Sequence, residues 1–253
     1  MRKSAIFLFF VTFCLTILGL SVQGGIAVPP QTARTKVKTE EKQKTEDSKQ
    51  RPVAKSKVYL LHSDLLRKDA SHPDAQIVTG NVKFRHDSVY MYCDSACYYD
   101  KVSSFEAFGN VKMVQGDTLF LYGDRLYYDG LTQIAEMRCN VRMENRTTTL
   151  LTDSLNYDRV YNLGYFFDGG TLMDEQNVLT SEWGEYSPQT KQSVFNYNVK
   201  LVNPQFTLTS DTLRYNTASK IADIVGPSDI WSDANHIYSE KGTYNTVTGK
   251  ADL

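Results

Sequence analysis

The sequence predicts an all-β fold built from stacked strands, and three observations support this prediction. The first is an internal repeat, in which a tyrosine returns every 29 residues along most of the chain. The second is a period-two alternation of apolar residues between these tyrosines, which is typical of strands. The third is the regular placement of Gly, Asn and Asp between the alternating segments, where turns or bends are expected. A fixed period of this length indicates supersecondary units stacked on one another.

Two further columns of side chains share this period. An apolar side chain stands seven residues before each tyrosine, and a short polar, mostly acidic side chain stands four residues before it. The tyrosines are Tyr99, Tyr128, Tyr157, Tyr186, Tyr215 and Tyr244; the apolar column is Tyr92, Leu121, Leu150, Leu179, Leu208 and Ile237; the acidic column is Ser95, Asp124, Asp153, Glu182, Asp211 and Glu240. The sequence therefore predicts about six repeats of 29 residues between positions 79 and 253, each with two long, kinked strands.

The chain begins with features of an exported protein. Arg2 and Lys3 precede an apolar run and small residues follow it, so residues 1–25 are predicted to be a secretory signal peptide. An uncleaved membrane anchor is the alternative, although the run is short for a full span.

Residues 26–57 have little to bury and predict a disordered, charged linker. The β-body is expected to run over residues 58–253. Its last strand is expected to leave an edge open for another chain, unless the sequence is a truncated form of a longer one.

Cysteine usage predicts structural thiols. Three cysteines follow the signal peptide, so at least one thiol is expected to be unpaired. Cys93 and Cys97 are four residues apart, which is about 13 Å in an extended strand and too far for a disulfide. Cys97 shares a column with Leu126 and Leu155, which predicts a small core residue. No histidine pair accompanies the thiols at the spacing of a zinc site, and no cofactor is expected.

The file of carboxylates has two interpretations. Stacked carboxylates occur in carbohydrate-active β-helix enzymes, but acid–base catalysis needs two carboxylates in different environments. Each carboxylate follows a small residue, so bend residues that cap exposed backbone are the favoured interpretation. The basic residues beside the apolar positions are expected to face outward into solvent: Lys83, Arg85, Lys112, Arg138, Arg142, Lys200 and Arg214. The 28 Lys and Arg balance 29 Asp and Glu, so bulk charge indicates no nucleic-acid partner.

Several segments resemble the OstA-like (LptA-like) family of periplasmic lipopolysaccharide-transport proteins, and the resemblance covers about residues 57–253. These segments are Gly80–Phe84, Cys93–Ala96, Phe105–Val111, Gly116–Thr118 and Ser210–Leu213. The resemblance implies an elongated β-jellyroll of stacked antiparallel strands whose apolar interior sheathes the acyl chains of lipopolysaccharide. It also implies edge-strand pairing with further copies or with other β-jellyroll proteins of a transport bridge, a periplasmic location with or without membrane association, and no enzymatic activity.

Under this resemblance, the apolar columns are expected to line a trough for lipid A. The expected trough residues are Val82, Phe84, Tyr90, Tyr92, Phe108, Val111, Met113, Leu119, Leu121, Met137, Val141, Met143, Leu150, Phe166, Leu179, Phe195, Phe206 and Leu208. A column of small residues would leave room beside them: Ala135, Gly164, Ser193 and Ala222. Methionines would adapt to flexible acyl chains. The same residues could form an ordinary core, so a structural or adhesive β-solenoid with a dry core is the first alternative, and a carbohydrate-active β-helix enzyme is the second.

Overall fold

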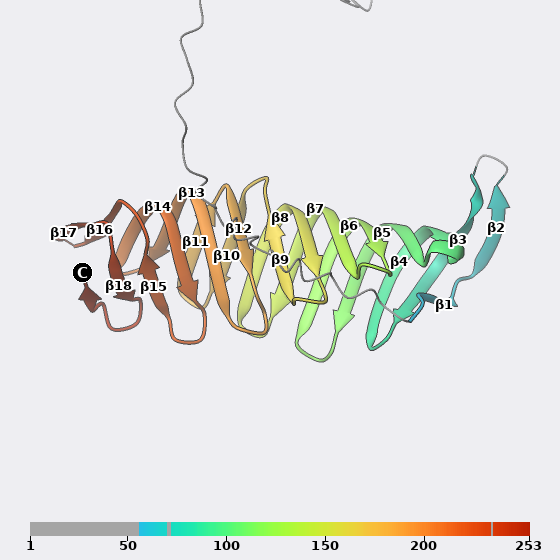
Figure 1. Ribbon diagram of the computed structural model, residues 1–253, viewed down its shortest axis with the longest axis horizontal. Coiled ribbons are helices and arrows are strands. Elements are labelled where there is room, and N and C mark those ends of the chain that lie inside the picture. The colour runs from blue at the N-terminus through green and yellow to red at the C-terminus, as the bar shows by residue number, and fades with distance from the viewer. Residues whose placement is uncertain (1–55, 70–71, 234) are drawn as a thin grey trace, which may run out of the picture. The chain divides into compact units, whose positions relative to one another are not determined.

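The computed structural model describes residues 56–69, 72–233 and 235–253, and this part of the chain is all-β (Figure 1). The predicted signal peptide and nearly all of the predicted linker lie outside the described residues. One short 3-10 turn, η1 (Asp100–Val102), accompanies the strands. The strands are β1 (Tyr59–His62), β2 (Leu65–Asp69), β3 (His72–His86), β4 (Val89–Tyr99), β5 (Ser104–Gln115), β6 (Leu119–Asp129), β7 (Ile134–Asn145), β8 (Thr148–Asp158), β9 (Leu163–Phe166), β10 (Gly170–Asp174), β11 (Asn177–Ser181), β12 (Trp183–Tyr186), β13 (Gln192–Asn203), β14 (Phe206–Asn216), β15 (Ile221–Ile224), β16 (Ser228–Ser232), β17 (Asn235–Ser239), β18 (Gly242–Asn245) and β19 (Ala251–Asp252).

The strands form one continuous antiparallel sheet that follows the order of the chain. Each long strand from β3 to β8 pairs with the strand before it and the strand after it. The pairs β9 with β10 and β11 with β12 each take the place of one long strand, and β13 and β14 continue the series. Figure 1 shows the strands stacked side by side from β2 at one end to β17 at the other. The predicted all-β, antiparallel jellyroll is confirmed.

Each long strand bends near its middle at a β-bulge. In β5 the pairing with β6 skips from Phe108 to Val111, and the two residues between them, Gly109 and Asn110, have φ of 75° and 43°. A positive φ costs glycine little conformational energy and is tolerated by asparagine, which explains the repeated Gly-Asn pair. Cys139 and Tyr197 occupy the glycine position of the bulge in β7 and β13 with φ of 63° and 66°. The bulges therefore divide the folded sheet into two layers.

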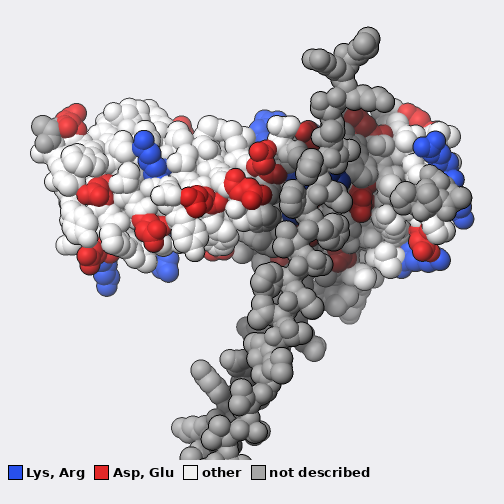
Figure 2. All heavy atoms as spheres, turned by 90° about the horizontal axis from the view of Figure 1, so that it is seen from above, with Lys and Arg blue, Asp and Glu red and all other residues white. Residues whose placement is uncertain are grey.

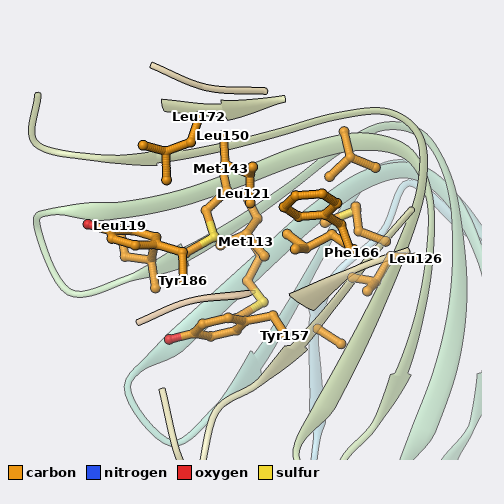
Figure 3. Close-up of a cluster of buried hydrophobic side chains, with 14 of the residues drawn as sticks. Met113, Leu119, Leu121, Leu126, Met143, Leu150, Tyr157, Phe166, Leu172 and Tyr186 are labelled. Carbon is orange, nitrogen blue, oxygen red and sulfur yellow. The ribbon is translucent and has the colours of Figure 1, made fainter. Parts of the chain in front are cut away.

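Layer 1 contains strand halves such as Val111–Gln115 and Leu119–Tyr122, and layer 2 contains halves such as Ser104–Phe108 and Arg125–Asp129. The apolar sides of the two layers face each other. Phe84 of layer 1 stacks on Phe105 of layer 2, with ring centroids 4.1 Å apart. One hydrophobic cluster runs through both layers, and Figure 3 shows part of it. The bends join the layers along one long edge of this interior.

The acidic column lies at the bends, as the bend interpretation predicts. The Asn110 side-chain amide donates a 2.8 Å hydrogen bond to Asp94, and the Asp153 carboxylate accepts a 3.2 Å bond from the backbone N–H of Asn140. The side-chain amides of Asn140 and Asn198 likewise donate hydrogen bonds, to Asp124 and to Glu182 respectively. Figure 2 shows acidic side chains recurring along one face of the described body. These carboxylates hold neighbouring bulges together.

The predicted register of the first repeat is wrong by one residue. Met91 pairs with Met113, which in turn pairs with Leu121, so Met91 takes the inward place predicted for Tyr92. In the same way Asp94 replaces Ser95 at the bend and Tyr98 replaces Tyr99 in the interior. The η1 turn and Ser103, in the left-handed conformation with φ of 56°, absorb the extra residue after β4. A one-residue slip turns every side chain of the strand to the other face.

Cys97 is consequently not the core residue that its column predicted. It is half-buried on the outer side of β4, opposite Glu106, whereas its neighbour Ala96 is 1% exposed. Cys93, Cys97 and Cys139 are all free thiols, in agreement with the spacing argument against a disulfide between Cys93 and Cys97. The described residues contain no helix long and apolar enough to span a membrane.

Candidate functional site: the apolar interior

Most of the expected trough residues lie between the two layers. Fifteen of the eighteen are buried, none of them more than 4% exposed. They are Val82, Phe84, Val111, Met113, Leu119, Leu121, Met137, Val141, Met143, Leu150, Phe166, Leu179, Phe195, Phe206 and Leu208. The small column is buried beside them: Ala135, Gly164, Ser193 and Ala222. Figure 3 shows side chains from both layers converging on this interior.

Tyr90, Tyr92 and Phe108 do not line the interior, contrary to the sequence-based expectation. The alternation of β4 turns Val89, Met91 and Cys93 inward, so the two tyrosines face outward. The Lys83 ammonium lies 4.9 Å from the Tyr90 ring centroid and 5.4 Å from that of Tyr92. The Arg125 guanidinium carbon lies 5.4 Å from the Phe108 ring centroid. Cation–π contacts of this kind are typical of partly exposed aromatic rings.

Layer 1 presents a long row of apolar side chains to the interior, nearly all straight or γ-branched, here called the Met–Leu row. Its members are cross-strand partners in register from one strand to the next: Met91, Met113, Leu121, Met143, Leu150, Leu172, Leu179, Leu201, Leu208 and Ile230. Every one of them is at most 1% exposed. Only the last is β-branched, and none is aromatic. Leu and Met change rotamer more easily than β-branched residues, so this wall can adapt its shape.

Layer 2 faces this row with tyrosines that alternate with small residues. The register is Tyr128, Ala135, Tyr157, Gly164, Tyr186, Ser193, Tyr215, Ala222 and Tyr244. The period of 29 residues arises because a tyrosine stands on every second strand. A ring needs the space that Ala, Gly or Ser leaves on the neighbouring strand. The tyrosine rings lie inside, and their hydroxyls reach the long edge opposite the bends.

Along this second edge, here called the seam, turns of layer 1 meet turns of layer 2 through side chains. The Tyr128 hydroxyl lies 2.7 Å from Nδ1 of His86, and Arg159 contacts both. The Tyr186 hydroxyl donates to Asn145, 3.3 Å away. The Tyr215 hydroxyl donates to Asp174, 2.8 Å away. The hydroxyls of these three tyrosines therefore contact turns of the opposite layer.

Burial shapes the protonation of these groups. Burial, and then the nearby Arg159 guanidinium, lower the pKa of His86, so its imidazole is neutral near pH 7. Burial raises the pKa of Tyr128 to about 12 and also raises those of Tyr157 and Tyr215. The tyrosine hydroxyls therefore stay protonated and can donate hydrogen bonds throughout the physiological range.

Comparison with known proteins identifies the family. The sequence profile of OstA-like proteins matches residues 55–211, which is more than half of the chain. The chain belongs to the OstA-like protein family. No curated protein matches it. Among solved structures, the chain is similar to LptH from Pseudomonas aeruginosa, described as the LptA-homologous periplasmic component of a conserved lipopolysaccharide transport device. The identity is 14%, the match covers 51% of this chain and 76% of LptH, and the TM-score is 0.24.

Within this OstA-like chain, three basic residues at the seam went unrecognised in the sequence: Arg159, Lys191 and Lys220. They lie in turns of layer 2, and each contacts a residue far away in the chain. Lys191 and Lys220 stand 29 residues apart, five residues after Tyr186 and Tyr215, which is the one sequence signal that could have found them. The seven basic residues that are expected to face outward lie on the outer side of their strands. Each of their side chains is half-buried or exposed.

Proposed function

We propose that this OstA-like protein carries lipopolysaccharide through the periplasm and shelters the acyl chains of lipid A between its two layers. The observation that carries the proposal is the Met–Leu row. It is continuous in register over ten strand positions, and nearly all its members are flexible. An acyl chain lying along it would gain about 0.8 kcal/mol for each methylene removed from water.

The proposed role is passive. Shielding of acyl chains requires only an apolar surface, and the energy for movement would come from another component. The carboxylates of the acidic column take part in the bulges, through bonds such as that from Asn110 to Asp94, which supports a structural use of that column over a catalytic one. The predicted signal peptide supports export to the periplasm. The proposed edges for pairing with other β-jellyroll chains are the two ends of the stack. Exposed apolar side chains stand there: Leu65 and Leu66 on β2, and Tyr238 on β17.

A structural solenoid with a dry core is the second candidate. It is favoured by the tight aromatic packing near β3. There Phe84 stacks on Phe105 with ring centroids 4.1 Å apart, and the tilted Tyr98 ring lies 5.3 Å from Phe84 between centroids. In a purely structural protein, the Met–Leu row would remain filled by its own side chains. The two candidates therefore differ in whether the row exchanges its contacts for those of a lipid.

Leu121→Trp tests the proposal. A bulky indole within the row would take the space of roughly two acyl methylenes, so the affinity for lipopolysaccharide should fall on the order of tenfold. The measurement is binding of fluorescently labelled lipopolysaccharide by anisotropy, on protein whose circular dichroism and melting curve show a folded sheet. Tyr122→Trp, at the next residue but on the outer face, is the matched control and should bind like the parent. A folded Leu121→Trp protein with unchanged affinity would favour the dry solenoid.

A further inference from the structure

The two layers are joined in different ways along their two long edges. At the bends the chain itself runs from one layer to the other in every long strand, so that edge can open only by breaking backbone pairing. At the seam, among the described residues, the turns of the two layers are linked by side chains. The seam is therefore the weaker of the two edges.

The seam contacts repeat as a ladder, and each contact set is here called a rung. The first rung joins His86 to Tyr128 and Arg159. In the second, the Gln115 amide donates to Asn162 at 2.8 Å and to the Tyr157 hydroxyl at 3.4 Å. The sequence separation between the tyrosine and its layer 1 partner is 42, 42, 41 and 41 residues from the first rung to the fourth.

The third and fourth rungs add a lysine from the neighbouring turn. Lys191 donates to Asn145, which also accepts from Tyr186. Lys220 lies 2.7 Å from Oδ2 of Asp174, whose side chain is fully buried. Each rung thus places one tyrosine hydroxyl and at least one further polar side chain between the apolar interior and the solvent.

The ladder is incompletely bonded. Five buried side-chain polar atoms have no hydrogen-bond partner among the described residues, and three of them belong to the rungs: Oε1 of Gln115, Nε of Arg159 and Oδ1 of Asp174. Buried polar atoms are nearly always bonded in folded proteins, so each such atom requires an explanation. Opening the seam would expose these atoms to water and offset part of the cost of separating the rungs. A hollow of about 320 Å³ already opens beside the fourth rung, lined by Asn177, Asn203, Lys220 and Thr246.

We propose that the seam is a lateral entrance, through which acyl chains pass sideways into the interior when the tyrosine rungs separate. This inference rests on the proposed function. The amphipathic shape of the ligand suits the geometry: the apolar chains reach the Met–Leu row, while the anionic headgroup stays at the rungs. There Arg159, Lys191 and Lys220 give up their intramolecular partners and face the headgroup phosphates. Entry through the two ends of the stack is the competing route.

Chemical clamps across the seam test the entrance. Cysteine pairs at Gln115 with Asn162 and at Asn145 with Lys191 would be bridged in the full chain by a reducible bis-thiosulfonate reagent. The background carries Cys14→Ala, Cys97→Ser and Cys139→Ser. Cys93 can stay, because burial raises the pKa of its thiol to about 12 and keeps it unreactive. The matched control clamp joins cysteines at Thr180 and Lys200, which are cross-strand partners on the outer side of layer 1.

The readout is the rate of uptake of fluorescently labelled lipopolysaccharide. With both seam clamps closed we expect uptake to slow at least tenfold, to recover on reduction, and to be unaffected by the control clamp. Uptake that is as fast with the seam clamped as without would overturn the entrance and leave entry through the ends. If the unclamped protein takes up no lipid at all, the proposed function itself fails, and the entrance fails with it.

Discussion

Leu150→Ala should lower the free energy of unfolding by about 2–5 kcal/mol, because it leaves a cavity in a fully packed interior. Leu150 is 1% exposed and stands in the middle of the Met–Leu row, paired with Met143 on one side and Leu172 on the other. Its neighbours are strands of a continuous sheet, which can close around the missing atoms only in part.

The next residue supplies the matched control. Leu151 is 37% exposed on the outer side of the same strand, so Leu151→Ala should change the free energy of unfolding by no more than about 0.5 kcal/mol. Urea denaturation of both variants measures the difference. Equal losses for the two leucines would contradict the assignment of layer 1's inner face.

Lys220→Met should cost about 3 kcal/mol of stability, because it leaves the fully buried Asp174 carboxylate without its cation. The Tyr215 hydroxyl would remain as a hydrogen-bond donor to that carboxylate, but a neutral donor replaces an ion pair poorly. Lys220 also lies 3.2 Å from Glu175, whose exposed side chain can turn to solvent at little cost. The effect therefore depends on Asp174.

A double-mutant cycle with Asp174→Asn tests this dependence. The asparagine removes the charge but keeps an oxygen for Tyr215, so the double variant should recover most of the stability that Lys220→Met loses. Lys200→Met, at an exposed lysine on layer 1, is the control and should be nearly neutral. Strictly additive losses in the cycle would show that Lys220 acts elsewhere than on Asp174.

The all-β fold, the bends and most of the interior could be predicted from the sequence, because each depends on local pattern. Alternation places Leu121 and Leu150 on an inner face, and the Gly-Asn pair at Gly109 supplies the positive φ that a bulge requires. These signals repeat, so each repeat supports the prediction for the others.

The first repeat shows where the pattern is insufficient. Tyr98 and Tyr99 fit the tyrosine column almost equally well, and only the left-handed turn at Ser103 decides that Tyr98 lies inside. A single extra residue in a turn leaves little trace in composition, yet it reverses the faces of a strand. The outward placement of Tyr90, Tyr92 and Cys97 follows from that slip.

The seam could not be predicted because its contacts join distant turns. The tyrosine at position 215 is visible as part of a repeat, but its partner Asp174 lies 41 residues earlier in an ordinary hairpin turn. Periodicity shows that a residue is repeated and does not show what it contacts. Only the folding of the sheet onto itself brings the two groups together.

Lipid contact inside the sheet can be measured most directly with a photoreactive amino acid at Leu121, in cells that make lipopolysaccharide. Leu121 is fully buried within the Met–Leu row, whereas Arg125, four residues later on the same strand, is exposed. We expect light to crosslink lipopolysaccharide at Leu121 and not at Arg125. No crosslink at either position, in protein shown to be folded and exported, would contradict a lipid-filled interior and leave a dry β-solenoid that shares only the fold of its family.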